Sequence, residues 1–242
     1  MTTSFSVYGL KTEIIAPGSD LVAILSEAAA SSESQGLKEG DVIVVAETVV
    51  ATAEGSLIRL SDVTPSSRAI DLAEQYSMDP RLVEIVLQES DSVVGGIKGF
   101  LLTMKGGTLL PNAGVDESNA PSGYVSPLPA DPDASAEALR RGLEDRWGVH
   151  IAVVIADSRT HAMRLGCSGI AIGCAGIRSV VDERGRHDLF GRELHVTQRA
   201  VADCIASAAE LVMGEADESV PAAIVRNIGL PIVDEKGIAS ID

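Results

Sequence analysis

Runs of apolar residues along the chain indicate where the buried strands lie. The segments 41–50 and 151–157 are rich in β-branched residues and predict two buried strands, the second of which stops at Asp157. The stretch that follows the first run, at 51–55, is expected to be a loop. Further strands are expected at 5–8, within 178–186 and at 221–229.

A second pattern, with apolar residues three and four positions apart, predicts amphipathic helices. The clearest case is 21–30, which Ser19 or Asp20 is placed to cap and which Gly36 is expected to end. The other expected helices are two that begin at the cap-and-proline pairs Thr64–Pro65 and Asp79–Pro80, one over 134–147 and one over 196–214.

Glycine and proline residues set the boundaries between these elements. Gly106 and Gly107 separate two apolar arms and predict a β-hairpin whose second arm ends at Asn112. Four prolines within 121–134 predict an ordered loop or a linker. Because strands are not followed regularly by crossover helices, we expect an α+β fold of mixed sheets with flanking helices, and not a doubly wound sheet.

Length, charge and cysteine content narrow the class of protein. The 242 residues predict one domain over 1–242, with two interwoven subdomains as the alternative. A net charge of -16 argues against nucleic acid and membrane surfaces as partners. No basic leader and no run of 18 apolar residues is present, so a cytoplasmic protein is expected. Cys167, Cys174 and Cys204 form no C-x-x-C pair, which predicts reduced thiols.

Acidic residues at the ends of apolar segments are the first candidates for chemistry. Asp116, Asp157 and Glu215, with the hydroxyl of Ser158, could together bind Mg²⁺ or Mn²⁺, which prefer oxygen ligands. The alternative for each acid alone is a turn or a helix cap. No glycine-rich phosphate loop is found, so a bound nucleotide would use other contacts. His161 has no second histidine nearby, and a zinc site is not expected.

Several motifs resemble one family over nearly the whole chain, the coenzyme F420-0:L-glutamate ligases. The most specific are N-A-G-V-D-E-S-N, which begins at Asn112, and D-L-F-G-R-E-L, which begins at Asp188. The supporting segments are V-Y-G-L at Val7, T-A-E-G at Thr52, T-P-S-S-R-A at Thr64, L-P-A-D-P-D-A-S-A-E-A-L-R-R at Leu128 and L-V-M-G-E at Leu211.

The resemblance implies a GTP-dependent amide ligase with a gamma-glutamyl-ligase-like fold and a butterfly-like homodimer. Its small-molecule substrates would be GTP, L-glutamate and the deazaflavin coenzyme precursor, whose carboxylate is activated as an acyl phosphate before the amine of glutamate displaces phosphate. Two Mg²⁺ or Mn²⁺ ions would bind at each site, and K⁺ is a further candidate cation.

The resemblance also assigns roles to residues at matching positions. Asp116 and Asp157 would bind one metal ion, and Ser158 and Glu215 the other, with Arg164 as a catalytic residue. Contacts to the nucleotide would come from Gly9, Leu10, Lys11, Thr12, Thr48, Thr52, Asn119, Met213, Gly214 and Asp217, within the segments 9–12 and 213–220.

At several positions the sequence departs from the family pattern, and Ser158 stands where the family usually has a threonine. Glu47 replaces a small hydroxyl residue, Thr52 replaces a lysine, and Thr160 and His161 replace a glycine and an arginine. The change at Glu47 adds a negative charge and the change at Thr52 removes a positive one, so each makes the binding of a triphosphate less favourable. Two alternatives therefore stay open: a diverged member that joins another acid and amine or uses another nucleotide, and a non-catalytic protein that binds nucleotide or metal.

Overall fold

The computed structural model describes residues 4–160 and 165–239. Within these ranges the chain forms two compact units, each with strands and helices. The larger contains 4–15, 19–50, 131–160 and 165–239, and the smaller contains 16–18 and 51–130. Sheets of mixed direction with flanking helices confirm the predicted α+β class.

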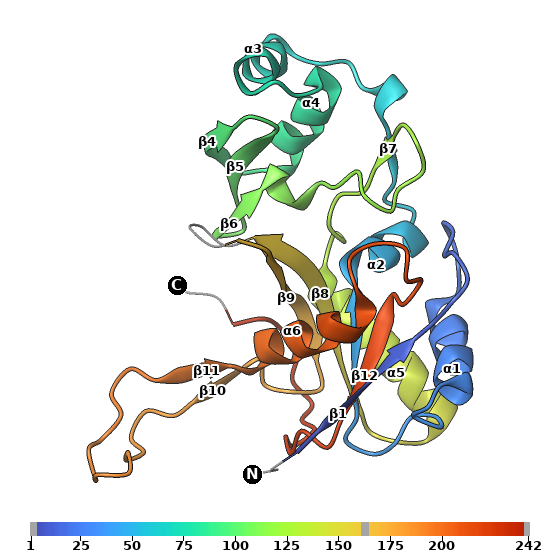
Figure 1. Cartoon of the computed structure of the whole chain (residues 1–242), viewed down its shortest axis with the longest axis vertical. Coiled ribbons are helices and arrows are strands. Elements are labelled where there is room, and N and C mark those ends of the chain that lie inside the picture. The colour runs from blue at the N-terminus through green and yellow to red at the C-terminus, as the bar shows by residue number, and fades with distance from the viewer. Residues whose placement is uncertain (1–3, 161–164, 240–242) are drawn as a thin grey trace. The chain divides into compact units, whose positions relative to one another are not determined.

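A five-stranded sheet forms the centre of the larger unit, in the order β1-β12-β2-β8-β9 (Figure 1). Its strands are β1 (Ser6–Leu10), β12 (Ala222–Arg226), β2 (Val42–Ala46), β8 (Ala152–Thr160) and β9 (Cys167–Ala175). The central pair β2–β8 is parallel and every other neighbouring pair in this sheet is antiparallel. Strand β2 and the first five residues of β8 are buried almost throughout, which explains the continuous apolar sequence of these stretches.

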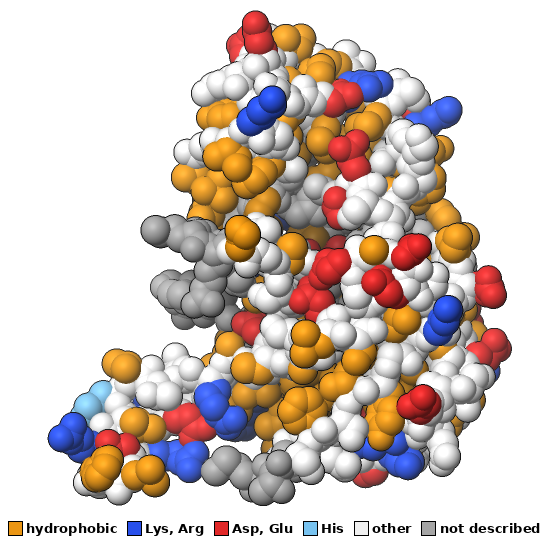
Figure 2. Space-filling model, viewed as in Figure 1, with side chains coloured by type: hydrophobic (Ala, Val, Ile, Leu, Met, Phe, Trp, Pro, Cys, Tyr) orange, Lys and Arg blue, Asp and Glu red, His pale blue; other side chains and the backbone are white. Residues whose placement is uncertain are grey.

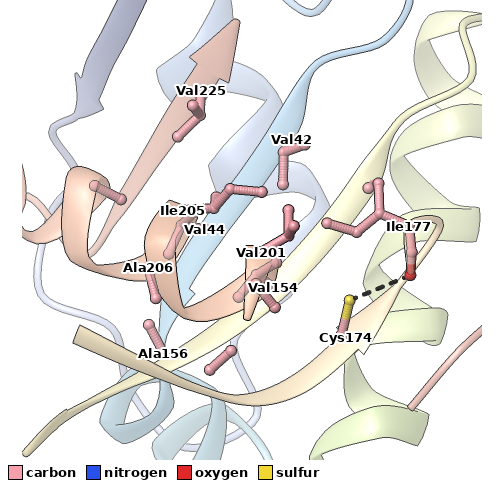
Figure 3. Packing of buried hydrophobic residues seen from close by; sticks show 14 of the residues in the cluster. Val42, Val44, Val154, Ala156, Cys174, Ile177, Val201, Ile205, Ala206 and Val225 are labelled. Atoms are coloured by element: carbon pink, nitrogen blue, oxygen red, sulfur yellow. Dashed lines mark hydrogen bonds between the residues drawn. The ribbon is translucent and has the colours of Figure 1, made fainter. Parts of the chain in front are cut away.

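Helices cover both faces of this sheet. Small and β-branched residues of α6 (Val201–Met213), among them Ile205 and Ala206, pack on Val44 and Val154 (Figure 3). Successive strand residues alternate between faces, so Ile43 and Val153 point to the opposite side. There α5 (Pro132–Trp147) packs on β8 and β9, and α1 (Leu21–Ser31) packs on α5.

The smaller unit has its own core, built around two helices and a three-stranded sheet. Leu82, Val86 and Leu101 are among the residues buried there. Its elements are β3 (Ile58–Arg59), α3 (Ser67–Tyr76), α4 (Pro80–Glu89), β4 (Ser92–Ile97), β5 (Phe100–Lys105), β6 (Thr108–Pro111), β7 (Tyr124–Val125) and the 3-10 turns Leu60–Asp62 and Asn112–Gly114. The glycine-linked hairpin is confirmed as β5–β6.

Two predicted segments change type partway along. The run 41–50 is strand only to Ala46, and Glu47–Ala53 forms helix α2, so the expected loop at 51–55 begins as helix. Val50 and Ala51 are buried from this helix, and a short apolar run cannot distinguish a buried strand from a buried helix. Of the helix expected over 196–214, the residues Gln198–Ala200 form β11, which pairs with β10 (Val180–Asp182), and the helix starts at Val201.

Three boundaries also differ from those expected. Helix α1 is capped by Asp20 but ends at Ser31, before Gly36. Helix α3 is capped by Ser66 and not Thr64, because the Ser66 hydroxyl accepts the amide of Ala69. Strand β8 does not stop at Asp157, since pairing with β9 extends it to Thr160. Among the described residues, no helix is long and apolar enough to cross a membrane.

Candidate active site

The carboxyl ends of the parallel strands β2 and β8 bring two acids to the same edge of the sheet. Ala46 and Ala156 are the last paired residues of the two strands, and Glu47 and Asp157 follow them directly. Burial, and then the charge of Asp157, raise the pKa of half-buried Glu47 to about 7. The Thr48 hydroxyl donates a hydrogen bond to Glu47 Oε1 at 2.6 Å. Two neighbouring carboxyls disfavour each other's ionised form, and a cation bound between them would relieve that repulsion.

Asp157 has a cationic partner on its own strand. The Nε of Arg159 lies 2.6 Å from Asp157 Oδ2, and only 13% and 14% of the two side chains are exposed. Residues two apart in a strand share a face, so the pairing follows from the extended backbone. The positive charge of Arg159 therefore compensates the negative charge of Asp157.

A second group of side-chain oxygens lies on the face of β8 that α6 covers. Ser158 shares the face of Ala156, and its hydroxyl donates to Glu215 Oε1 at 3.1 Å. Glu215 directly follows Gly214, the residue that ends α6. Burial, and then the neighbouring Glu215, raise the pKa of Glu210 to about 7. Asp157 and Ser158 thus belong to two separate groups of side-chain oxygens, which lie on opposite faces of β8.

The segments 9–12 and 213–220, both expected to contact nucleotide, lie against each other in the larger unit. The amide of Thr12 donates to the carbonyl of Ser219 at 3.1 Å. A Cβ on Gly9 would meet Val220 Cγ1 at 2.8 Å, so a larger residue at this position would have to displace the Val220 side chain. Gly214 has a φ of +76°, and a Cβ there would lie 2.4 Å from the carboxyl carbon of Glu218.

The remaining described candidates belong to the smaller unit. Asp116 is exposed, and its Oδ1 accepts the amide of Ser118 at 3.0 Å, which is the turn contact that the sequence left open as an alternative. The backbone of Asp116 pairs with Ser126. Asn119 has a left-handed φ of 54°, and Thr52 is 8% exposed on α2. His161 and Arg164 lie outside the described residues.

The donor atoms of these groups suit a hard divalent cation. Carboxylates and a hydroxyl are the ligands that Mg²⁺ and Mn²⁺ prefer. The raised pKa values of Glu47 and Glu210 reflect burial first and a neighbouring carboxylate second. Over the residues that the structure describes, no three His, Cys, Asp or Glu side chains converge on one point. Any cation bound by Ser158 and Glu215 would therefore take further oxygens from water or phosphate, as Mg²⁺ commonly does.

Sequence reasoning missed Glu210 as a member of this site. It lies in the last turn of α6, five positions before Glu215, where the helical pattern continues without interruption. The signal that could have identified it is an acid at the C-terminal end of a helix, where negative charge opposes the helix dipole. The sequence shows acids in this unfavourable position at 215–218, and Glu210 places another one about one helical turn earlier.

Comparison with known proteins identifies the family. A family model described as F420-0:gamma-glutamyl ligase matches residues 9–227. A protein of Methanopyrus kandleri named coenzyme F420:L-glutamate ligase is 48% identical over 215 residues, which cover 88% of this chain and 83% of the relative. Proteins of the same name are 42% identical over 222 residues in Methanothermobacter thermautotrophicus, covering 91% and 88%, and 39% identical over 237 residues in Archaeoglobus fulgidus, covering 98% and 91%. The chain belongs to the F420-0:gamma-glutamyl ligase family.

Proposed function

We propose that this protein is an amide ligase that joins L-glutamate to the carboxylate of coenzyme F420-0, with GTP and divalent cations as its requirements. The observation that carries the proposal is the family match over residues 9–227, a range that contains the proposed oxygen ligands Asp157, Ser158 and Glu215. The relatives' shared name supports the choice of glutamate and coenzyme F420 as substrates.

The proposed ligation proceeds in two steps, phosphorylation of the carboxylate and its attack by the amine. A carboxylate oxygen of the coenzyme precursor attacks the γ-phosphorus of GTP, the bond to the bridging oxygen breaks, and GDP leaves. The amine nitrogen of L-glutamate then attacks the carbonyl carbon of the acyl phosphate, and inorganic phosphate leaves as the nitrogen loses a proton. Activation is needed because a carboxylate is a poor electrophile, and the chain's contribution is to hold the reacting groups in line.

Two groups of oxygen ligands would hold the cations. Asp116 and Asp157 are proposed for one ion, and Ser158 and Glu215 for the other, which agrees with the opposite faces of β8 on which Asp157 and Ser158 lie. When bound, such ions would neutralise phosphate charge. The adjacent segments 9–12 and 213–220, joined by the Thr12–Ser219 hydrogen bond, support a role in holding GTP. Arg164 remains the proposed catalytic residue.

A reconstituted assay tests the proposal. The purified full chain would be incubated with coenzyme F420-0, L-glutamate, GTP and Mn²⁺, and glutamyl product, GDP and phosphate would be measured together. Product should form only when all components are present. Glu215→Gln should reduce it at least tenfold, and Glu27→Gln, on the exposed side of α1, should not. Absence of product under all conditions would contradict the proposal.

Glu47 favours a second candidate function, the ligation of another acid and amine or the use of another nucleotide. The acid lies next to Asp157 at the sheet edge, and it adds negative charge where the family pattern has a hydroxyl residue. If divergence is the reason, the double substitution Glu47→Ser with Thr52→Lys should increase the rate with GTP and coenzyme F420-0. An unchanged or lower rate, with normal folding, would favour the first function.

We also propose that the protein is a homodimer. The support is a ribbon of the larger unit, 180–200, which contains β10 and β11 and projects away from the sheet (Figure 1). At its far end Leu189 and Phe190 are 99% and 89% exposed, and hydrophobic side chains are visible there in Figure 2. Adjacent exposed apolar side chains of this size commonly mark a protein–protein contact.

A further inference from the structure

A glycine in β9 determines how closely α6 approaches the site. Gly169 is paired with Ser158 across the β8–β9 ladder. A Cβ built on Gly169 would lie 2.7 Å from the backbone carbon and oxygen of Ala206, so the helix rests directly on the strand backbone. Figure 3 shows Ala206 on the side of α6 that faces the sheet. No larger residue could occupy position 169 without moving the helix.

Two α6 side chains use this close approach to hydrogen-bond the buried backbone of Gly169. The hydroxyl of Ser207 donates to the Gly169 carbonyl at 2.8 Å. Glu210, three residues further along the same helix face, accepts the backbone amide of Gly169 through its carboxylate. The strand backbone at Gly169 is therefore held on both its carbonyl and its amide.

The carboxyl of Glu210 also reaches the second group of side-chain oxygens, those of Ser158 and Glu215. It lies within hydrogen-bonding reach of the Ser158 hydroxyl and of the Glu215 carboxyl, which are themselves joined at 3.1 Å. Ser158, Glu210 and Glu215 come from a strand, a helix and the segment after that helix. A single side chain anchored to Gly169 thus contacts both proposed ligands of one cation.

We propose that Glu210 is a positioning residue, anchored by the Gly169 amide, that orients the Ser158 hydroxyl and the Glu215 carboxylate toward a divalent cation. The inference rests on the proposed function, because it concerns the cation that this function requires. Groups that orient the ligands of a metal ion typically change its affinity 10- to 100-fold when they are mutated. Glu210 acts through Ser158 and Glu215 and not through the substrates.

Direct measurement of Mn²⁺ binding tests the role. Free Mn²⁺ would be titrated by electron paramagnetic resonance in the presence of GDP, with the wild type, Glu210→Gln and Ser207→Ala compared. Glu210→Gln keeps an oxygen for the Gly169 amide but removes the charge, and should weaken Mn²⁺ binding by about tenfold or more. Ser207→Ala removes the neighbouring helix–strand hydrogen bond only, and its Mn²⁺ affinity should stay within twofold of the wild type.

A second variant separates positioning from negative charge alone. Glu210→Asp keeps the charge but is one methylene shorter, so it should also bind Mn²⁺ more weakly if reach matters. Thermal unfolding without metal shows whether each variant folds, and a purely structural role would lower the midpoint without changing Mn²⁺ affinity. Wild-type affinity in Glu210→Gln or in Glu210→Asp would overturn the inference.

The same measurements distinguish an error in the proposed function from an error in the role of Glu210. A wild-type chain that binds no Mn²⁺ with nucleotide and forms no glutamyl product would contradict the proposed function and the inference together. A wild-type chain that binds Mn²⁺ and forms product, with a Glu210→Gln variant that does both equally well, would contradict only the role of Glu210.

Discussion

At the scale of single residues, a buried ion pair joins distant parts of the larger unit. Arg226 Nη2 lies 2.7 Å from Asp41 Oδ2, with 9% and 1% of the side chains exposed. The same guanidinium donates to the carbonyls of Ser34 and Gly36 at 2.8 Å. The arginine therefore satisfies backbone groups that follow α1, and Asp41 compensates its charge where water is excluded.

Removing the carboxylate should destabilise the protein strongly. In Asp41→Asn the buried guanidinium loses its counterion, which typically costs about 3–5 kcal/mol. Unfolding in urea can be followed by the fluorescence of Trp147, the single tryptophan, which lies in the larger unit beside Gly36. The control is Glu235→Gln, because Glu235 pairs with Arg178 at the surface with 52% and 66% of the side chains exposed. A loss below about 1 kcal/mol for Asp41→Asn would contradict the assignment.

Residue-level chemistry was predictable from the sequence only where it depended on local order. Asp157, Ser158 and Glu215 stand at the ends of apolar segments, and that position was visible without a structure. The contacts of Glu210 depend on which residue of β9 faces Ser158 and on how closely a helix can approach a glycine. Register and packing distance are tertiary properties, so the sequence pattern could not provide them.

At the scale of elements, helix α5 carries a network of charges along one side. Glu137 accepts from Arg140 Nε at 2.7 Å and from Arg141 Nε at 2.6 Å, and Arg140 also reaches Glu144 and Asp234. The hydrogen bond from Arg140 is the main cause that lowers the pKa of Glu137 from 4.5 to about 2. The network ties the C-terminal segment to a helix that packs on the central sheet.

The lowered pKa of Glu137 predicts a specific pH dependence of stability. The ionised form is favoured by folding, so its stabilisation is complete above pH 4.5 and is lost as pH falls toward about 2. Glu137→Gln should lower the free energy of unfolding at pH 7, by at most about 3 kcal/mol, and should flatten its pH dependence between these values. Urea midpoints measured across this range test it, and a Glu137→Gln curve parallel to that of Glu27→Gln would contradict it.

The β10–β11 ribbon is ordered by its own backbone and side-chain hydrogen bonds. The amide of Leu194 donates to the carbonyl of Arg186, and Asp188 Oδ1 accepts the amides of Phe190 and Arg192 at 2.8 and 2.9 Å. Such local bonding explains how an apolar end can stay extended without a core beneath it.

If the ribbon forms the dimer contact, polar substitutions at its end should separate the subunits. Leu189→Ser with Phe190→Ser should shift the protein from dimer to monomer in sedimentation velocity experiments, because two large apolar side chains lose their buried area. Ile70→Ser, at a 49% exposed position on α3, is the matched control and should leave the dimer intact. A double variant that remains dimeric would show that the contact lies elsewhere.

The elements themselves were predictable where period and capping signals agreed. Helix α4 begins at Pro80 after the Asp79 cap, and the Gly106–Gly107 hairpin has the expected arms. The errors fall where a local pattern fits two structures. The β-branched residues after Ala46 are helical because pairing with β8 ends there, and Gln198–Ala200 leave the expected helix because β10 offers a pairing edge. Both outcomes depend on residues far away in the sequence.

Over the whole molecule, the net charge of -16 attracts cations even where no specific site exists. Added cations screen self-repulsion in an acidic protein and can stabilise it without occupying a site. Specific binding differs because it stabilises the folded state according to ligand concentration and affinity, by about 2.7 kcal/mol at one hundred times the dissociation constant. A comparison at constant ionic strength separates the two effects.

Mn²⁺ with GTP should therefore raise the melting temperature beyond the effect of NaCl at equal ionic strength. For a chain of this size, saturation should raise it by about 5–10 °C. Trp147 fluorescence reports the larger unit, in which Ser158 and Glu215 meet. The increase should disappear in Glu215→Gln, which loses a proposed cation ligand, and persist in Glu27→Gln. Equal melting temperatures in Mn²⁺ with GTP and in matched NaCl would show that the acidic groups attract cations only as a general property of charge.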